Sequence, residues 1–129
     1  MTWLSDIGSY LQTGKMGTLG TDMFYSDFDL TSHNCIALIA HAGPITKTTL
    51  RMTMKLERPS LGILVRNVSN SSAETKAKEI YDYLNFTFNT TIGSTRFKSI
   101  KAVAPYFYVG QDKANNYIYS INFSLEISE

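Results

Sequence analysis

Two stretches of the chain carry apolar residues at helical spacing. Residues 2–14, TWLSDIGSYLQTG, place apolar side chains three and four positions apart, which predicts a helix that ends at Gly14. Residues 69–84, SNSSAETKAKEIYDYL, show the same period, and Ser71 with Glu74 forms a candidate capping box. Two main helices are therefore expected.

Alternation of apolar and polar residues with a period of two predicts the strands. It is clearest in residues 117–128, YIYSINFSLEIS, where every second side chain from Tyr117 to Ile127 is apolar. The stretch RPSLGILVRN, residues 58–67, alternates in the same way, and we expect its Arg66 to be available to solvent or to another subunit. Further strands are predicted at 22–28, 34–40, 86–92, 95–103 and 106–110.

The order of these elements predicts an α+β domain, because one helix, three strands and a second helix are followed by strands alone. We expect a largely antiparallel or mixed β-sheet with two main helices packed on one face. Residues 41–60 are the least regular part, and TTLRMTMKLE within them alternates cleanly, so an extended loop or β-hairpin arm is predicted there. The length of 129 residues predicts a single domain, residues 1–129.

The composition indicates an ordinary globular protein with no strong overall field. Hydrophobic residues make up 43% and charged residues 18%, and the formal net charge is +1. A single cysteine, Cys35, excludes an intramolecular disulfide and fits a reducing compartment. The longest apolar run, CIALIA, is far shorter than the ~20 residues of a membrane helix, so we expect no membrane association.

Charge is nevertheless unevenly distributed along the chain. Acidic residues dominate the first 29 positions, which hold Asp6, Asp22, Asp27 and Asp29 against Lys15. Basic residues dominate positions 47–66, which hold Lys47, Arg51, Lys55, Arg58 and Arg66 against Glu57. Partner choice is therefore expected to depend on local patches rather than on net charge.

The sequence offers little catalytic equipment. Cys35 with His33 or His41 is the one conceivable pair of nucleophile and base, and no orienting group or oxyanion hole is recognisable beside it. We expect Cys35 to be a buried structural cysteine. Two histidines and one cysteine match no familiar zinc spacing, and the glycines from 14 to 20 form no phosphate loop. We expect no catalytic site, metal or cofactor.

One predicted strand has a composition that also suits nucleic acid. Arg96, Lys98 and Lys101 are interleaved with Phe97 and Ile100, which resembles a basic strand with an aromatic platform. A solvated strand face accounts for the same alternation. A nucleic-acid-binding module stays open as an alternative function, as does a thiol enzyme at Cys35.

Three consecutive aromatic residues, Tyr106, Phe107 and Tyr108, follow Pro105. Neighbouring side chains of a strand point to opposite faces, so these rings cannot all enter one core. We expect at least one of them to meet another subunit or another loop.

The chain closely resembles, over nearly its whole length, the bacteriophage minor capsid family that contains tail terminator proteins. The most specific parts are the Pro-x-Leu-x-Ile-x-Val-Arg strand at 59–66 and the Ala-x-x-Ile-Tyr-x-x-Leu helix at 77–84. The third is a Gly-x-Asp at 110–112, followed by Tyr-x-x-Ser-Ile-Asn-Phe at 117–123.

This resemblance implies a structural protein of the virion without catalysis. Its subunits are expected to form a homo-oligomeric ring, usually of six, that caps the head-proximal end of the tail tube and presents a surface to the head connector. The implied partners are the tail tube protein and a connector or stopper protein, with no membrane and no small-molecule substrate. DNA would pass through the ring at most transiently, and the host cytoplasm would hold the protein during assembly. Another connector or tail-tube component is the alternative within the same particle.

Residues 41–60 are longer and more basic than the resemblance leads us to expect, which suggests an arm that reaches a neighbouring subunit. We expect basic residues 47–58 to approach the acidic segment 22–29 of that neighbour. The candidate interface residues are Asp22, Asp27, Asp29, Lys47, Arg51, Lys55, Arg58, Arg66, Tyr106 and Tyr108. Changing Arg51 and Lys55 to glutamate should weaken ring formation, and unchanged assembly at low and high salt would contradict the contact.

Overall fold

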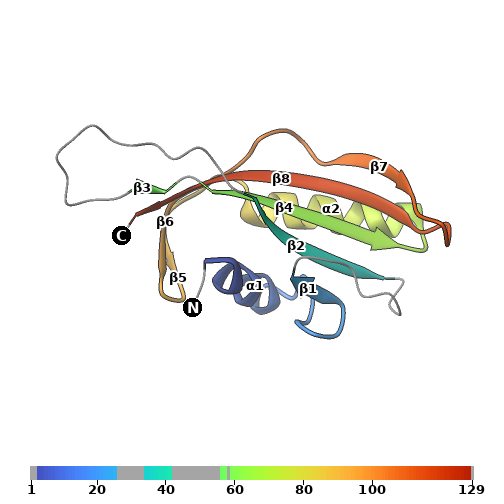
Figure 1. Ribbon diagram of the computed structural model, residues 1–129, viewed down its shortest axis with the longest axis horizontal. Helices are drawn as coiled ribbons and strands as arrows, with labels where there is room; N and C mark the ends of the chain where they lie inside the picture. The colour runs from blue at the N-terminus through green and yellow to red at the C-terminus, as the bar shows by residue number, and fades with distance from the viewer. Residues whose placement is uncertain (1–2, 26–33, 42–55, 58, 129) are drawn as a thin grey trace.

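The structure is a computed structural model that describes residues 3–25, 34–41, 56–57 and 59–128 (Figure 1). These residues form two helices, α1 (Trp3–Thr13) and α2 (Asn70–Leu84). They also form eight strands: β1 (Met23–Tyr25), β2 (Cys35–His41), β3 (Leu56–Glu57), β4 (Ser60–Asn67), β5 (Thr87–Ile92), β6 (Thr95–Ala102), β7 (Phe107–Gln111) and β8 (Tyr117–Ser128). The predicted α+β class is confirmed.

The long strand β8 organises the sheet. The strands lie in the order β1-β2-β4-β8-β6-β5, and β3 and β7 also pair with β8. Strand β4 pairs with one edge of β8. On the other edge, β7 pairs with the first part of β8 and β6 pairs with the second part. All pairs are antiparallel except β1 with β2. The sheet is therefore mixed and largely antiparallel, as predicted.

The register gathers the apolar side chains on one face of the sheet. Leu61 lies opposite Phe123 and Ile63 lies opposite Ile121, so the alternating positions of β4 and β8 coincide. Buried residues of both helices join the same core, among them Ile7 of α1 and Ile80 of α2. Both helices therefore cover one face, as the sequence predicts.

The two helices also contact each other. The rings of Tyr10 in α1 and Tyr83 in α2 stack with their centroids 4.8 Å apart, and the Tyr83 hydroxyl donates to the Tyr10 carbonyl. A Cβ on Gly14 would meet the Tyr83 ring, so the small residue after α1 leaves room for this contact.

Helix α2 begins earlier than the capping box predicts. Its N-cap is Ser69, whose hydroxyl accepts from the Ser72 amide at 3.4 Å, and Ser71 lies inside the first turn. The Asn67 side chain accepts from the Ser69 amide, so the end of β4 sets where the helix starts. Glu74, the second residue of the predicted capping box, instead accepts from the Tyr119 hydroxyl. The predicted cap at Ser71 is therefore wrong.

Strand β6 contains an irregularity that the alternation does not predict. The register shifts between Phe97 and Ser99, so Phe97 and Ile100 both face the core although they are three residues apart. Phe97 is fully buried and cannot serve as an aromatic platform for nucleic acid. The interpretation of residues 96–101 as a nucleic-acid-binding strand required an exposed Phe97 ring, and this ring is not exposed.

Most of the predicted arm at 41–60 lies outside the described residues. Within it, Leu56–Glu57 forms β3 and pairs with Ile127 and Ser128 of β8. The arm and the single-domain organisation stay predictions.

Candidate subunit interface

The described part of the chain holds four of the ten predicted interface residues: Asp22, Arg66, Tyr106 and Tyr108. The other six lie outside the described residues: Asp27, Asp29, Lys47, Arg51, Lys55 and Arg58. The contact between the segments 47–58 and 22–29 therefore stays a prediction. Asp22 accepts from the Thr18 amide at 2.6 Å and closes a turn between α1 and β1.

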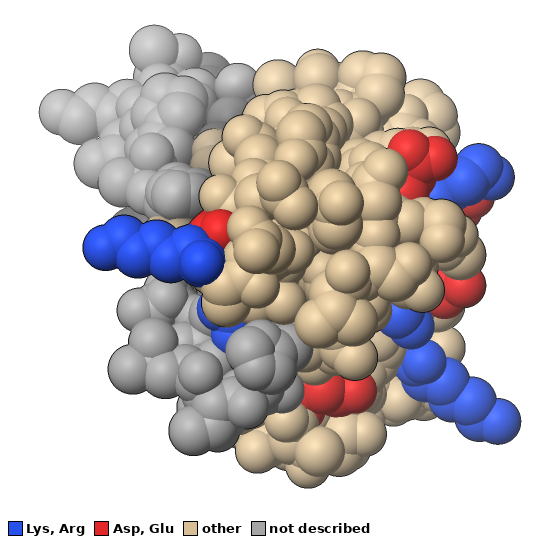
Figure 2. Space-filling model, turned by 90° about the vertical axis from the view of Figure 1, so that its right-hand side faces the viewer, with Lys and Arg blue, Asp and Glu red and all other residues tan. Residues whose placement is uncertain are grey.

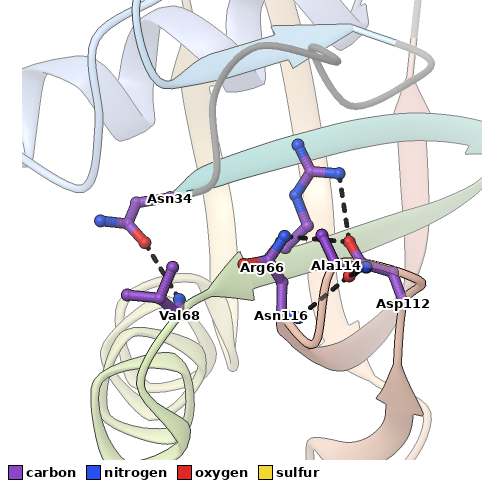
Figure 3. Close-up of polar contacts among 6 residues, drawn as sticks. All are labelled: Asn34, Arg66, Val68, Asp112, Ala114 and Asn116. Atoms are coloured by element: carbon purple, nitrogen blue, oxygen red, sulfur yellow. Dashed lines mark hydrogen bonds and ion pairs between the residues drawn. The ribbon is translucent and has the colours of Figure 1, made fainter.

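Arg66 is enclosed by its own chain. Its side chain leaves the end of β4, and Nη1 lies 3.5 Å from Oδ2 of Asp112 in the turn between β7 and β8 (Figure 3). The residue is only 8% exposed. Arg66 is therefore not open to solvent, because this turn folds back over the strand end, and its contact with another subunit stays a prediction.

The turn between β7 and β8 is built around the Asp112 carboxylate (Figure 3). Oδ1 accepts from the amides of Ala114 at 3.0 Å and Asn116 at 2.9 Å, and Oδ2 accepts from Nδ2 of Asn116 at 3.1 Å. These bonds, led by the Asn116 amide, lower the pKa of Asp112, and the Arg66 charge contributes in the same direction. An aspartate at the start of QDKANN is a typical turn signal, so the sequence contained the information for this bond pattern.

The lowered pKa of Asp112 predicts a pH-dependent contribution to stability. A carboxyl group whose pKa is lower in the folded chain stabilises the fold above its unfolded value of 3.8, and the contribution fades as pH falls through the folded value. Replacing Asp112 by asparagine should therefore lower the melting temperature at pH 7, with a difference that shrinks below pH ~4. Thermal unfolding of both proteins from pH 7 to pH 2.5 measures this, and a constant difference would contradict it.

Five tyrosines form a cluster between α2, β7 and β8, which we call the tyrosine patch: Tyr81, Tyr106, Tyr108, Tyr117 and Tyr119. The ring centroids of Tyr108 and Tyr119 are 5.5 Å apart, and Tyr106 lies 6.4 Å from Tyr119. Tyr108 is half-exposed, whereas Tyr106 is partly buried and contacts the rings of Tyr81 and Tyr119. The prediction that these consecutive aromatics do not share one core is confirmed.

The tyrosine patch is fixed by polar contacts beneath it. The Tyr119 hydroxyl lies 2.8 Å from Oδ1 of Asn70 and 3.3 Å from Oε2 of Glu74. Burial raises the pKa of Tyr119, and the Glu74 carboxylate adds to that effect, so this hydroxyl remains a neutral donor. The N-terminal turn of α2 is thereby held against β8.

A second exposed aromatic group, which we call the phenylalanine patch, consists of Phe86, Phe88 and Lys101. The two rings stack with centroids 6.4 Å apart, and Nζ of Lys101 lies 5.6 Å from the Phe88 ring centroid. Phe86 is 68% and Phe88 49% exposed. The sequence singled out Lys101 as a basic strand residue but did not indicate Phe86 and Phe88, because the alternation of FTFNTTI does not show which side of the strand is covered.

The structure also describes the surroundings of Cys35, on which the alternative of a thiol enzyme depends. Cys35 is buried, as expected, beside a hollow of about 110 Å³, which is smaller than the ~300–1,000 Å³ of ordinary ligand pockets. Within the described ranges, no cluster of His, Cys, Asp and Glu is suited to hold a metal ion. Neither helix among these residues is long and apolar enough to cross a membrane.

Comparison with known proteins decides the family. A family model described as bacteriophage tail terminator protein matches residues 10–129. The chain belongs to the tail terminator family. The matched residues contain both patches and the Asp112 turn. As a family member, the chain is a bacteriophage tail structural protein.

Solved structures share the tail terminator fold at low sequence identity. A chain of the virion of a native gene transfer agent particle is 15% identical, with a TM-score of 0.61, over 85% of this chain and 81% of that chain. A second solved structure is 11% identical, with a TM-score of 0.59, over 97% of this chain and 89% of that chain. No curated protein matches the chain.

Proposed function

We propose that this tail terminator subunit forms a ring, most simply of six copies, at the head-proximal end of the tail tube. The ring ends polymerisation of the tube protein and offers the surface to which the head connector or stopper attaches. The observation that carries the proposal is the match of the tail terminator model over residues 10–129. The likeness to a chain of a gene transfer agent virion supports a place in the particle.

The surface of the subunit supports self-association. Strand β7 presents Phe107, Tyr108 and Val109, each about half-exposed, and β5 presents Phe88 near the opposite end of β8. Exposed apolar residues on separate elements suit a subunit that contacts neighbours on two sides. The rigid sheet places these contacts, and catalysis is no part of the role.

At one end of the subunit, the residues that the structure describes offer a mostly uncharged surface. Figure 2 looks onto the end that holds β7 and the N-terminus of α2, and charged side chains lie at its margins around a broad uncharged area. Protein interfaces have this distribution, whereas duplex DNA selects a continuous basic surface. We therefore expect protein partners, with DNA passing the ring only transiently.

Electron microscopy of phage particles made with this reading frame disrupted tests the proposal. Overlong tail tubes together with full heads that lack tails would establish a terminator. Tails of normal length detached from heads would overturn the termination role and leave head joining, and normal virions would overturn both. A plasmid copy of the intact gene should restore normal particles, which excludes effects on neighbouring genes.

A further inference from the structure

The tyrosine patch and the phenylalanine patch lie on opposite faces of the sheet. Tyr108 is opposite Tyr119, whose side chain points toward α2, so the tyrosine patch is on the helix-covered face. Phe88 is opposite Ser99, and the neighbouring pair, Thr87 with Ile100, holds the core residue Ile100. Neighbouring side chains of a strand point to opposite faces. Phe88 therefore points away from the helices.

The two patches also lie at opposite ends of one strand. Strand β7 pairs with Tyr117–Ser120 at the start of β8, and β6 pairs with the second half of β8, up to Ser128 (Figure 1). Tyr108 pairs with Tyr119 of β8, whereas Ser99, opposite Phe88, pairs with Glu126, so the two patches are separated along β8 by ~24 Å at ~3.4 Å per residue and face opposite sides of the sheet. The patches of one chain therefore cannot meet each other.

The chemistry of the patches is complementary. The tyrosine patch presents the half-exposed ring of Tyr108 beside the buried Tyr119, whose hydroxyl contacts the Glu74 carboxylate. The phenylalanine patch presents apolar rings beside the Lys101 ammonium, and no ion pair joins Lys101 to another described residue. Tyrosine and phenylalanine side chains bury large apolar areas, and a lysine is attracted both to aromatic faces and to a carboxylate.

We infer that the tyrosine patch of one copy packs against the phenylalanine patch of the next copy, with Lys101 of one facing Glu74 of the other. The inference rests on the proposed ring, because it assumes that copies associate. A contact between two different patches is head-to-tail, and repetition around an axis closes it into a ring. It accounts for both patches at once, whereas a nucleic acid on Lys101 would leave the tyrosine patch unexplained.

Alanine substitutions in each patch test the contact. Tyr108→Ala and Phe88→Ala should each weaken self-association of the full chain at least ~10-fold, as truncation of a central aromatic residue does in other interfaces. Val68→Ala removes an equally exposed apolar side chain outside both patches and should leave association unchanged. Sedimentation equilibrium over a concentration series, repeated by co-sedimentation with purified tail tubes, measures the effect.

Mixing the variants distinguishes a head-to-tail contact from a symmetric one. Each single variant retains one intact patch, so a mixture of Tyr108→Ala with Phe88→Ala should form dimers and nothing larger. Charge reversal gives an independent test. Glu74→Lys and Lys101→Glu should each weaken association. A chain that carries both changes should regain association, because its reversed charges meet across the contact. Lys15→Glu, outside both patches, is the matched control.

The outcomes separate this inference from the proposed function. If the unaltered chain associates and the patch variants associate equally well, the inference is overturned and the ring stands. If the unaltered chain associates neither in solution nor on tail tubes, the ring itself is overturned. Circular dichroism and melting curves accompany each variant, and Tyr108→Thr or Phe88→Thr, which suit a strand, replaces an alanine variant that does not fold.

Discussion

Replacing Phe123 by alanine should lower the free energy of unfolding by about 3–5 kcal/mol, the usual cost of emptying a buried phenylalanine site. Phe123 is fully buried in β8, between Leu61 of β4 and Ala102 of β6, on the face that the helices cover. Strands on both sides and helices above limit the collapse of the cavity. Because a domain of this size is stable by only ~5–15 kcal/mol, the variant should lose a large part of its stability.

The chain offers a matched control for this loss. Phe88→Ala removes the same side chain from a half-exposed position on β5 and should change the free energy of unfolding by less than about 1 kcal/mol. Urea denaturation followed by tyrosine fluorescence and circular dichroism measures both variants. Equal losses at the two positions would show that the core does not lie where the register of β4 and β8 places it.

Replacing Gly93 by alanine should cost about 2–4 kcal/mol, from a strained backbone and a displaced carboxylate. Gly93 has a φ of +61°, and a Cβ there would collide with Oδ1 of Asp6. Asp6 lies in the first turn of α1, is 1% exposed, and accepts from the hydroxyls of Ser94 and Thr95. A methyl group would push it away from these donors and separate α1 from the β5–β6 hairpin.

Gly20 serves as a control that separates the cost of the left-handed backbone from the cost of displacing the Asp6 carboxylate. It has a φ of +84° and no heavy atom within 4 Å of an added Cβ, so Gly20→Ala should cost only the ~1–2 kcal/mol of the left-handed backbone. In an Asp6→Ala background, the cost of Gly93→Ala should fall to that of Gly20→Ala. An undiminished cost in that background would show that Asp6 is not the group that Gly93 accommodates.

The strongest periodic signals in the sequence predicted their elements well. The helix at 69–84 and the strand at 117–128 correspond to α2 and β8, because an apolar stripe repeated over twelve or more residues has one arrangement that buries it. The same holds for the strand RPSLGILVRN, which is β4, lies between β2 and β8, and supports α2 with its apolar side. Local pattern and tertiary packing agree in these segments.

The sequence-based predictions that were wrong concern positions where segments distant in the chain contact each other. Ser71 is a good capping residue, but the end of β4 starts the helix at Ser69. Arg66 has the appearance of an exposed strand end until the Asp112 turn, more than forty residues away, encloses it. The bulge at Lys98 lies where the register of β6 against β8 shifts, between Phe97 and Ser99. No local window contains these partners.

For the candidate interface, the sequence singled out the aromatic run at Tyr106–Tyr108 because three consecutive rings cannot enter one core, but it did not indicate Phe88. Whether a phenylalanine on a strand is covered depends on its neighbours in space.

The sequence by itself determined the α+β class, the main helix α2 and the alternation of β4 and β8, because these follow from the periodicity of apolar residues along the chain. The tail terminator family came from the resemblance of its motifs and from the family match, not from periodicity. Only the tertiary structure decided that Arg66 is enclosed, that Phe97 is buried while Phe88 is not, and that the two aromatic patches lie on opposite faces and ends. Exposure and pairing depend on which segments the sheet brings together, and that arrangement is set by the packing of the whole domain.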